Sequence, residues 1–197
     1  PLFRSSAASD VYKRQGIRLK MLEESLIIYK LMTTEETPSF NGTYYQIDGA
    51  INQPKPIQKP YPPLWVCGGG EKVTLKLLAK YGDYGNWDVD VEGFIHKTNI
   101  LKEHCKNEQR DFNEIGKTLH TNVLIANTKS ELDKKIEKLS KYTNIPQENY
   151  YEKPLIGTKE EVFNTIKEFE EVDCSYLIAY IPDIVWGDTL NILSELN

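Results

Sequence analysis

From residue 64 onward, short apolar runs alternate with longer segments whose apolar residues recur at helical spacing. The strands predicted from this pattern are residues 64–67, 83–87, 119–126 and 176–181, of which 64–67 and 176–181 are the most apolar. Strands that alternate with helices form parallel sheets through right-handed crossovers. We therefore predict an α/β fold with four parallel strands. On this pattern alone they are either the start of an open doubly wound sheet or half of a closed barrel.

The segments between these strands have the spacing of amphipathic helices. We predict helices over residues 73–81 and 91–107 and a short last helix after residue 183, and Leu19, Leu22, Leu26 and Tyr29 predict another over 17–32. Two further helices begin with the S/T-x-x-E signature of a capping box, at Thr128 and at Thr158. Their expected apolar faces are Leu132, Ile136 and Leu139 in the first, and Val162, Ile166 and Phe169 in the second.

Two features before residue 64 are extended rather than helical. Asn41-Gly42, between β-forming residues, favours a hairpin over residues 40–47. Residues 54–63 contain five prolines, which exclude a helix or an inner strand. We expect an extended connector over the surface, followed by a strand at 64–67 that is buried on both faces because all four of its residues are apolar.

Residues 1–15 differ from the rest of the chain. They follow neither the helical nor the strand period, lack an initiator Met, and are similar to a translated sequencing linker. We predict a non-native or disordered tail at 1–15 and the C-terminal part of a barrel domain at 16–197, which starts inside a longer gene. A genuine flexible tail is the alternative.

Composition narrows the classes of function. The net charge of −5 argues against broad nucleic-acid binding, and no run approaches the ~18 apolar residues of a membrane span. The three cysteines form no C-x-x-C pair and the three histidines no metal-spaced cluster. We expect a cytoplasmic protein with reduced cysteines that binds a small molecule and no metal, membrane or nucleic acid.

Gly68, Gly69 and Gly70 follow the first predicted strand and precede a helix. Such a turn presents backbone N–H groups at a positive helix end and can hold a phosphate. The run is neither G-x-G-x-x-G nor a P-loop. A plain tight turn explains three glycines equally well.

The surrounding motifs make this turn more specific. Residues 40–45 match F-x-G-x-Y-Y, residues 55–63 match K-P-x-Q-x-P-x-P-P, and a Gly-rich strand end follows at 67–70. Residues 79–86 are close to A-x-Y-A-D-x-x-N. From residue 16 to the C-terminus the chain resembles the luciferase-like monooxygenase family, most of all its deazaflavin (coenzyme F420)-dependent branch.

The resemblance implies the C-terminal half, about four βα units, of a TIM-type (β/α)8 barrel. The predicted strands would be the fifth to eighth, with coenzyme F420, or alternatively FMN, at their carboxyl ends. The implied cofactor-binding residues are Cys67, Gly68, Gly69, Gly70, Glu71, Asn86 and Trp87. Cys67 stands where the family usually has Gly and Gly82 where it has Ala. Trp87 lines the pocket or, alternatively, packs at the barrel rim.

Three functions remain open. The first is hydride transfer between deazaflavin and an organic substrate, the second is FMN-dependent monooxygenation, and the third is a non-catalytic, phosphate-binding half-barrel. In the family, the first four strands supply most of the pocket around the reactive ring, so we name no catalytic residue. We expect this chain alone to be inactive and to bind cofactor weakly or not at all, and a homodimer is open for the full-length protein.

Overall fold

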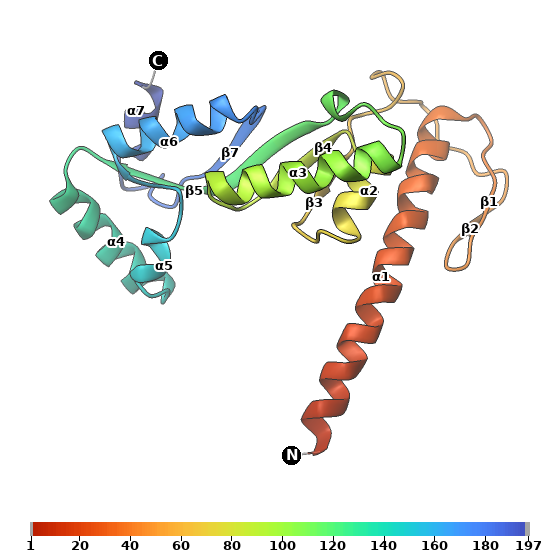
Figure 1. Cartoon of the computed structure of the whole chain (residues 1–197), viewed down its shortest axis with the longest axis horizontal. Coiled ribbons are helices and arrows are strands. Elements are labelled where there is room, and N and C mark those ends of the chain that lie inside the picture. Colours follow the sequence, from red (N-terminus) through yellow and green to blue (C-terminus); the bar gives the residue numbers. More distant parts are fainter. Residues whose placement is uncertain (1, 196–197) are drawn as a thin grey trace.

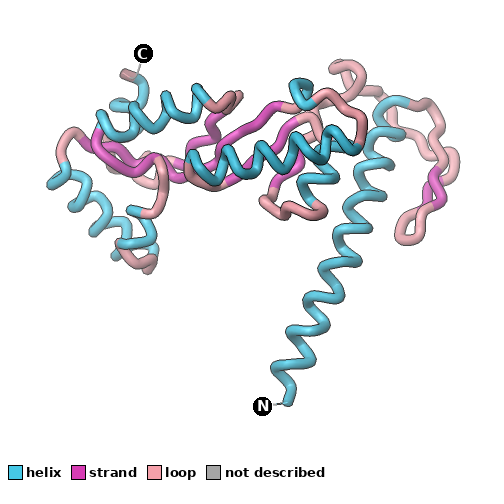
Figure 2. Tube along the Cα trace, in the orientation of Figure 1, coloured by secondary structure: helices cyan, strands magenta, loops and turns pink. Residues whose placement is uncertain are grey.

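A parallel five-stranded sheet forms the centre of the protein (Figures 1 and 2). The structure is a computed structural model that describes residues 2–195, and side chains from residue 14 onward. The strands are β3 (Trp65–Cys67), β4 (Tyr84–Trp87), β5 (Gly116–Ala126), β6 (Leu155–Thr158) and β7 (Tyr176–Tyr180). The prediction of an α/β fold with parallel strands is confirmed.

The long strand β5 organises the sheet. Its first residues pair with β4, residues 118–122 pair with β7, and residues 123–126 pair with β6. The four predicted strands are therefore neighbours in the order β3-β4-β5-β7. The count of four missed β6, because only Leu155 and Ile156 in it are apolar and Gly157-Thr158 also begins a helix.

All the predicted helices are present. They are α2 (Thr74–Tyr81), α3 (Val91–Asn107), α4 (Lys129–Thr143), α6 (Lys159–Glu171) and α7 (Thr189–Ser194). Thr128 with Glu131 and Thr158 with Glu161 form the two expected capping boxes. The short helix α5 (Glu148–Tyr151) and the 3-10 turn η1 (Phe112–Glu114) were not predicted, because one helical turn leaves no periodic pattern.

One face of the sheet packs against helices α2, α3 and α6. Leu78 of α2, Phe94 of α3 and Val162 of α6 are buried there in one cluster with Leu119 of β5. A smaller cluster lies under α4 and contains the expected Leu132, Ile136 and Leu139. Of the residues predicted to form the face of α2, Val73 is 39% exposed because it precedes the helix.

The opposite face of the sheet is exposed at β3 and β7. Trp65 of β3 is 39% exposed, and Tyr176 and Tyr180 of β7 are 54% and 62% exposed. The prediction that residues 64–67 are buried on both faces is therefore wrong. The end of β5 differs, because Leu124 and Ala126, which alternate with Val123 and Ile125 of the main core, are buried in the smaller cluster under α4. In a closed barrel this second face is the interior.

The first helix, α1 (Leu2–Thr34), contains the predicted helix at 17–32 but begins earlier. It projects away from the sheet toward the N-terminus (Figure 1). Residues 2–15 contain neither Pro nor Gly, so nothing in them breaks a helix that continues backward from residue 17. The backbone of residues 2–15 is helical in this structure, and the interpretation of residues 1–15 as a non-native or disordered tail stays a prediction. The division of the chain at residue 15 stays a prediction.

The hairpin of β1 (Phe40–Asn41) and β2 (Gln46–Ile47) is confirmed, with antiparallel pairing of Phe40 to Ile47. Residues 54–63 form the expected irregular connector, and Lys55 donates from it to the carbonyl of Met32 near the end of α1 (2.8 Å). Among the described residues, no helix is both long enough and apolar enough to cross a membrane.

Candidate functional site

The pairing of β3 with β4 brings most of the predicted site residues to one edge of the sheet. Cys67 at the end of β3 is directly opposite Asn86 of β4. Beyond them, a pocket of ≈ 360 Å³ opens at the carboxyl ends of these strands. Its lining is Cys67, Gly68, Gly69, Asn86, Trp87, Asp88, Val89 and His120. Five of the seven predicted residues thus share one pocket, although cofactor binding itself stays a prediction.

The glycine loop leaves backbone donors available beside this pocket. Gly68 has φ +115°, a conformation that side chains rarely adopt, and its N–H donates to the carbonyl of Asn86 (3.3 Å). The N–H groups of Gly69 and Gly70 donate to no acceptor within the described part of the chain. Helix α2 starts just beyond, and Val73 gives its first turn no side-chain cap.

A phosphate group fits this loop. A Cβ added to Gly69 would meet only the side chain of Lys97, at 3.5 Å, so the space beside Gly69 is open. Gly70 is different, since its added Cβ would lie 2.7 Å from Oγ1 of Thr74, and it does not line the pocket. The absence of a side chain at position 70 is thus explained by close packing on Thr74 at the start of α2. Its N–H remains a candidate donor.

Helix α3 holds the loop from behind. Nζ of Lys97 lies 2.9 Å from the carbonyl oxygen of Gly69 and 2.5 Å from Oε1 of Glu71. Nε2 of His104 lies 2.7 Å from the carbonyl oxygen of Glu71. The hydrogen bond from Lys97 holds the pKa of Glu71 below its usual range, with a smaller contribution from His96. Glu71 therefore faces α3 and fixes the loop, outside the pocket.

A row of polar side chains crosses the open face of three strands in register. Asn86 of β4 pairs with Cys67 of β3 on one side and with Thr118 of β5 on the other. Nδ2 of Asn86 lies 3.9 Å from the sulfur of Cys67, and the hydroxyl of Thr118 lies 3.1 Å from Oδ1 of Asn86. The Asn86 amide is thereby oriented at the base of the pocket.

The side chain of Trp87 lies on the other face of β4. It is 2% exposed and packs edge-to-face on Phe94, with ring centroids 5.3 Å apart. Phe94 in turn packs on Phe169 of α6 (5.6 Å). The side chain of Trp87 is thus used for packing, whereas a contact between Trp87 and a cofactor stays a prediction.

Sequence reasoning did not include His120 in the site. His120 is exposed, lines the pocket and lies on β5 opposite Ile178 of β7. The signal was present in the alternation along β5, since Thr118, His120 and Asn122 are two residues apart and share one face. Residues 119–126 were predicted only as a strand, without assignment of their side chains to either face.

Asp83 and Gly82, which belong to the A-x-Y-A-D-x-x-N motif, have structural roles. Oδ2 of Asp83 accepts from the N–H of Leu64 (2.7 Å) and so joins the starts of β3 and β4, at the edge opposite the pocket. A Cβ on Gly82 would lie 2.7 Å from Cδ1 of Leu78 and 2.8 Å from Cγ2 of Val66. Glycine instead of alanine here accommodates the close packing of α2 on β3.

A larger hollow, of ≈ 670 Å³, lies where helices α4 and α6 begin, and Thr128 and Thr158 are among its lining residues. The capping boxes of both helices already occupy N–H groups of their first turns. Lys159, which also lines the hollow, is 2.8 Å from Glu195. The smaller pocket at the glycine loop, with its unoccupied donors, is therefore the better candidate for a cofactor.

Comparison with known proteins now decides the family. The model of the luciferase-like monooxygenase family matches residues 14–162. The chain belongs to this family. The four neighbouring strands β3, β4, β5 and β7 are accordingly part of a luciferase-like (β/α)8 barrel rather than of an open doubly wound sheet.

Solved structures of the same fold include enzymes with different cofactors. An F420-dependent secondary alcohol dehydrogenase in complex with an F420-acetone adduct has a TM-score of 0.77 at 18% identity, over 92% of this chain and 62% of that one. The coenzyme F420-dependent tetrahydromethanopterin reductase from Methanopyrus kandleri has 0.66 at 14%, over 90% and 61%. EDTA monooxygenase from Chelativorans sp. BNC1 has 0.70 at 14%, over 92% and 58%. The chain thus spans about three fifths of the length of these proteins.

Proposed function

We propose that this chain forms the phosphate-binding wall of the cofactor site in a luciferase-like oxidoreductase, with coenzyme F420 as cofactor and a small organic molecule as substrate. The observation that carries the proposal is the pocket at the carboxyl edge of β3 and β4, beside two unoccupied N–H groups of the glycine loop. Active sites of (β/α)8 barrels lie at this edge. The F420-dependent enzymes of the same fold support the choice of cofactor.

In this proposal the residues of this chain bind and orient the cofactor. The N–H groups of Gly69 and Gly70 would donate to phosphate oxygens, and Lys97 keeps the loop in place through the carbonyl of Gly69. Asn86, held by Thr118, offers an amide at the base of the pocket. When bound, the deazaflavin ring supplies the hydride chemistry, and the protein supplies position and electrostatics.

FMN is the second candidate cofactor, which would make the parent protein a monooxygenase that uses reduced flavin and oxygen. The EDTA monooxygenase of the same fold, and a riboflavin lyase solved with modified FMN at a TM-score of 0.66, support this alternative. Both cofactors carry a phosphate, so the glycine loop suits either one.

The test is a titration of the chain with coenzyme F420 and with FMN at millimolar concentrations, followed by amide NMR. We expect weak, saturable binding that shifts the amide signals of Gly69, Gly70 and Asn86, with F420 binding more tightly than FMN. Tighter binding of FMN would favour the monooxygenase. If inorganic phosphate shifts these signals and neither cofactor does, the non-catalytic phosphate-binding module replaces both proposals.

A further inference from the structure

His120 lines the pocket beside the glycine loop, where a charge on its imidazole can act on a bound anion. The pairing of His120 with Ile178 places it one step beyond the row of Cys67, Asn86 and Thr118, toward the carboxyl edge. Its side chain is exposed and lines the same pocket as Gly68 and Gly69. Among residues 14–195, no protein group forms a hydrogen bond with its imidazole.

The other histidines and charged groups around the pocket are already paired. Glu71 forms an ion pair with Lys97 (2.5 Å), and His96 lies 3.2 Å from the same carboxylate. Asp88, which lines the pocket, pairs with Lys153 (2.6 Å). These two carboxylate–ammonium pairs contribute no net charge, so protonation of His120 sets the charge of the pocket.

We infer that His120 is a phosphate-binding residue of this pocket, which in its protonated form makes the binding of the cofactor's phosphate depend on pH. This inference rests on the proposed function and adds a side chain to the backbone donors of the glycine loop. An imidazolium donates a charge-assisted hydrogen bond to an anionic oxygen, whereas neutral imidazole contributes no charge.

The sign of the pH dependence follows from the groups that face His120. Its face of the sheet carries Cys67 of β3 and Tyr176 and Tyr180 of β7, none of which is a carboxylate or an ammonium group. Asp88, beyond β4, is paired with Lys153. Protonation of His120 therefore adds one positive charge, and anion binding weakens as the pH rises and this charge is lost.

The experiment measures binding and the histidine itself. Sulfate is the first probe, because it remains a dianion between pH 5.5 and 8, and FMN and coenzyme F420 are the second and third. The chain has three histidines, so the imidazole carbon-bound protons can be assigned by NMR with His120→Gln and His96→Gln. His96→Gln is the matched control, because His96 lies on α3 beside Glu71 and outside the pocket lining.

We expect each anion to shift the imidazole signals of His120, and sulfate, whose charge is constant, to bind about tenfold more weakly at pH 8 than at pH 5.5, as befits one charge-assisted contact. His120→Gln should remove this pH dependence and His96→Gln should retain it. Cofactor binding with an unmoved His120 signal, or with the same pH dependence in His120→Gln, would overturn the inference and leave the proposed function standing. Sulfate binding through His120 without binding of either cofactor would overturn the proposed function and leave His120 only as an anion-binding residue, and absence of any anion binding would overturn both.

Discussion

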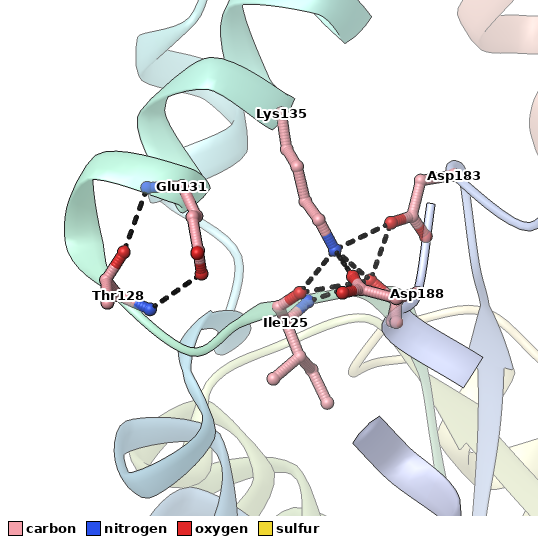
Figure 3. A network of polar contacts seen from close by, with 7 residues as sticks. Ile125, Thr128, Glu131, Lys135, Asp183 and Asp188 are labelled. Atoms are coloured by element: carbon pink, nitrogen blue, oxygen red, sulfur yellow. Dashed lines mark hydrogen bonds and ion pairs between the residues drawn. The ribbon is translucent and has the colours of Figure 1, made fainter. Parts of the chain in front are cut away.

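Nζ of Lys135 on α4 lies 2.9 Å from Oδ2 of Asp183, a carboxylate with no exposed surface in the segment that follows β7 (Figure 3). Lys135 also donates to the carbonyl of Ile125 in β5 (2.6 Å) and pairs with Asp188 (2.5 Å). The hydroxyl of Thr189 lies 2.9 Å from the same oxygen of Asp183. One ammonium thus joins α4, the end of β5 and the last helix of the chain.

Lys135→Met should destabilise the protein by about 3–5 kcal/mol, because it leaves a buried carboxylate without its partner. Urea unfolding followed by circular dichroism measures the loss. Lys134→Met is the matched control, since Lys134 is exposed on the same helix. The double variant Lys135→Met with Asp183→Asn should recover part of the stability, and equal losses in Lys135→Met and Lys134→Met would show that the pair is unimportant.

The contact of Lys135 with Asp188 should make the stability of the protein depend on pH. A hydrogen bond from Lys135 holds the pKa of Asp188 below its usual range. A carboxylate with a lowered pKa stabilises the folded state above its ordinary pKa, about 3.9, and this contribution is lost as the pH falls further. Chemical shift titration of the Asp188 side chain should therefore give a lowered midpoint in the wild type, and Lys135→Met should return it to the ordinary value. An unchanged midpoint in that variant would contradict the contact.

Gly69→Val should weaken cofactor binding at least tenfold without unfolding the chain. The backbone at Gly69 does not require glycine, and an added Cβ would meet only the side chain of Lys97. The branched side chain would instead fill the space that we assign to the phosphate. Gly16→Val is the control, because nothing lies within 4 Å of a Cβ at Gly16. Unchanged affinity for F420 and FMN in Gly69→Val would refute the phosphate loop.

Gly68→Ala tests the shape of the loop rather than its ligand. Its φ of +115° is strained for any residue with a Cβ, so we expect a loss of about 1–3 kcal/mol in the free energy of unfolding. Gly69→Ala, at the neighbouring position, should be nearly neutral in the same urea measurement. If the two alanine variants are equally stable, the left-handed turn at Gly68 is not required.

The sequence predicted the parts of this fold whose pattern is long and periodic. The helical spacing at 91–107 and the capping signatures at Thr128 and Thr158 were sufficient, because each depends on local chemistry. Strand β6 was missed because its four residues contain two apolar side chains and a helix start. The exposure of Trp65 could not be predicted from its neighbours in sequence, since it depends on what covers the second face of the sheet.

The candidate site divides in the same way. Cys67, Gly68 and Asn86 came from motifs, and the pairing of β3 with β4 brings them together. His120 belongs to no such motif and enters the pocket through the register of β5, which only the structure shows. The role of Glu71 was also beyond sequence reasoning, because its partner Lys97 lies on another helix.

Glu24 of α1 holds the loop of the hairpin. Its carboxylate accepts hydrogen bonds from the N–H groups of Thr43 (2.8 Å), Tyr44 (2.9 Å) and Tyr45 (2.9 Å). Partial desolvation raises the pKa of Glu24, but the three backbone donors outweigh it, so the pKa lies below the usual range. The carboxylate therefore anchors the hairpin above the ordinary glutamate pKa of about 4.3, and the anchor is lost as the pH falls through the lowered value.

Amide chemical shifts measure this directly. The signals of Thr43, Tyr44 and Tyr45 should titrate together with one midpoint below about 4.3, and Glu24→Gln should abolish that titration. We also expect faster hydrogen exchange of the three amides in Glu24→Gln at neutral pH, because the neutral amide oxygen is a weaker acceptor. Glu36→Gln, in the loop after α1, is the control and should change neither measurement. Three amides that titrate independently, or not at all, would show that Glu24 does not hold the hairpin.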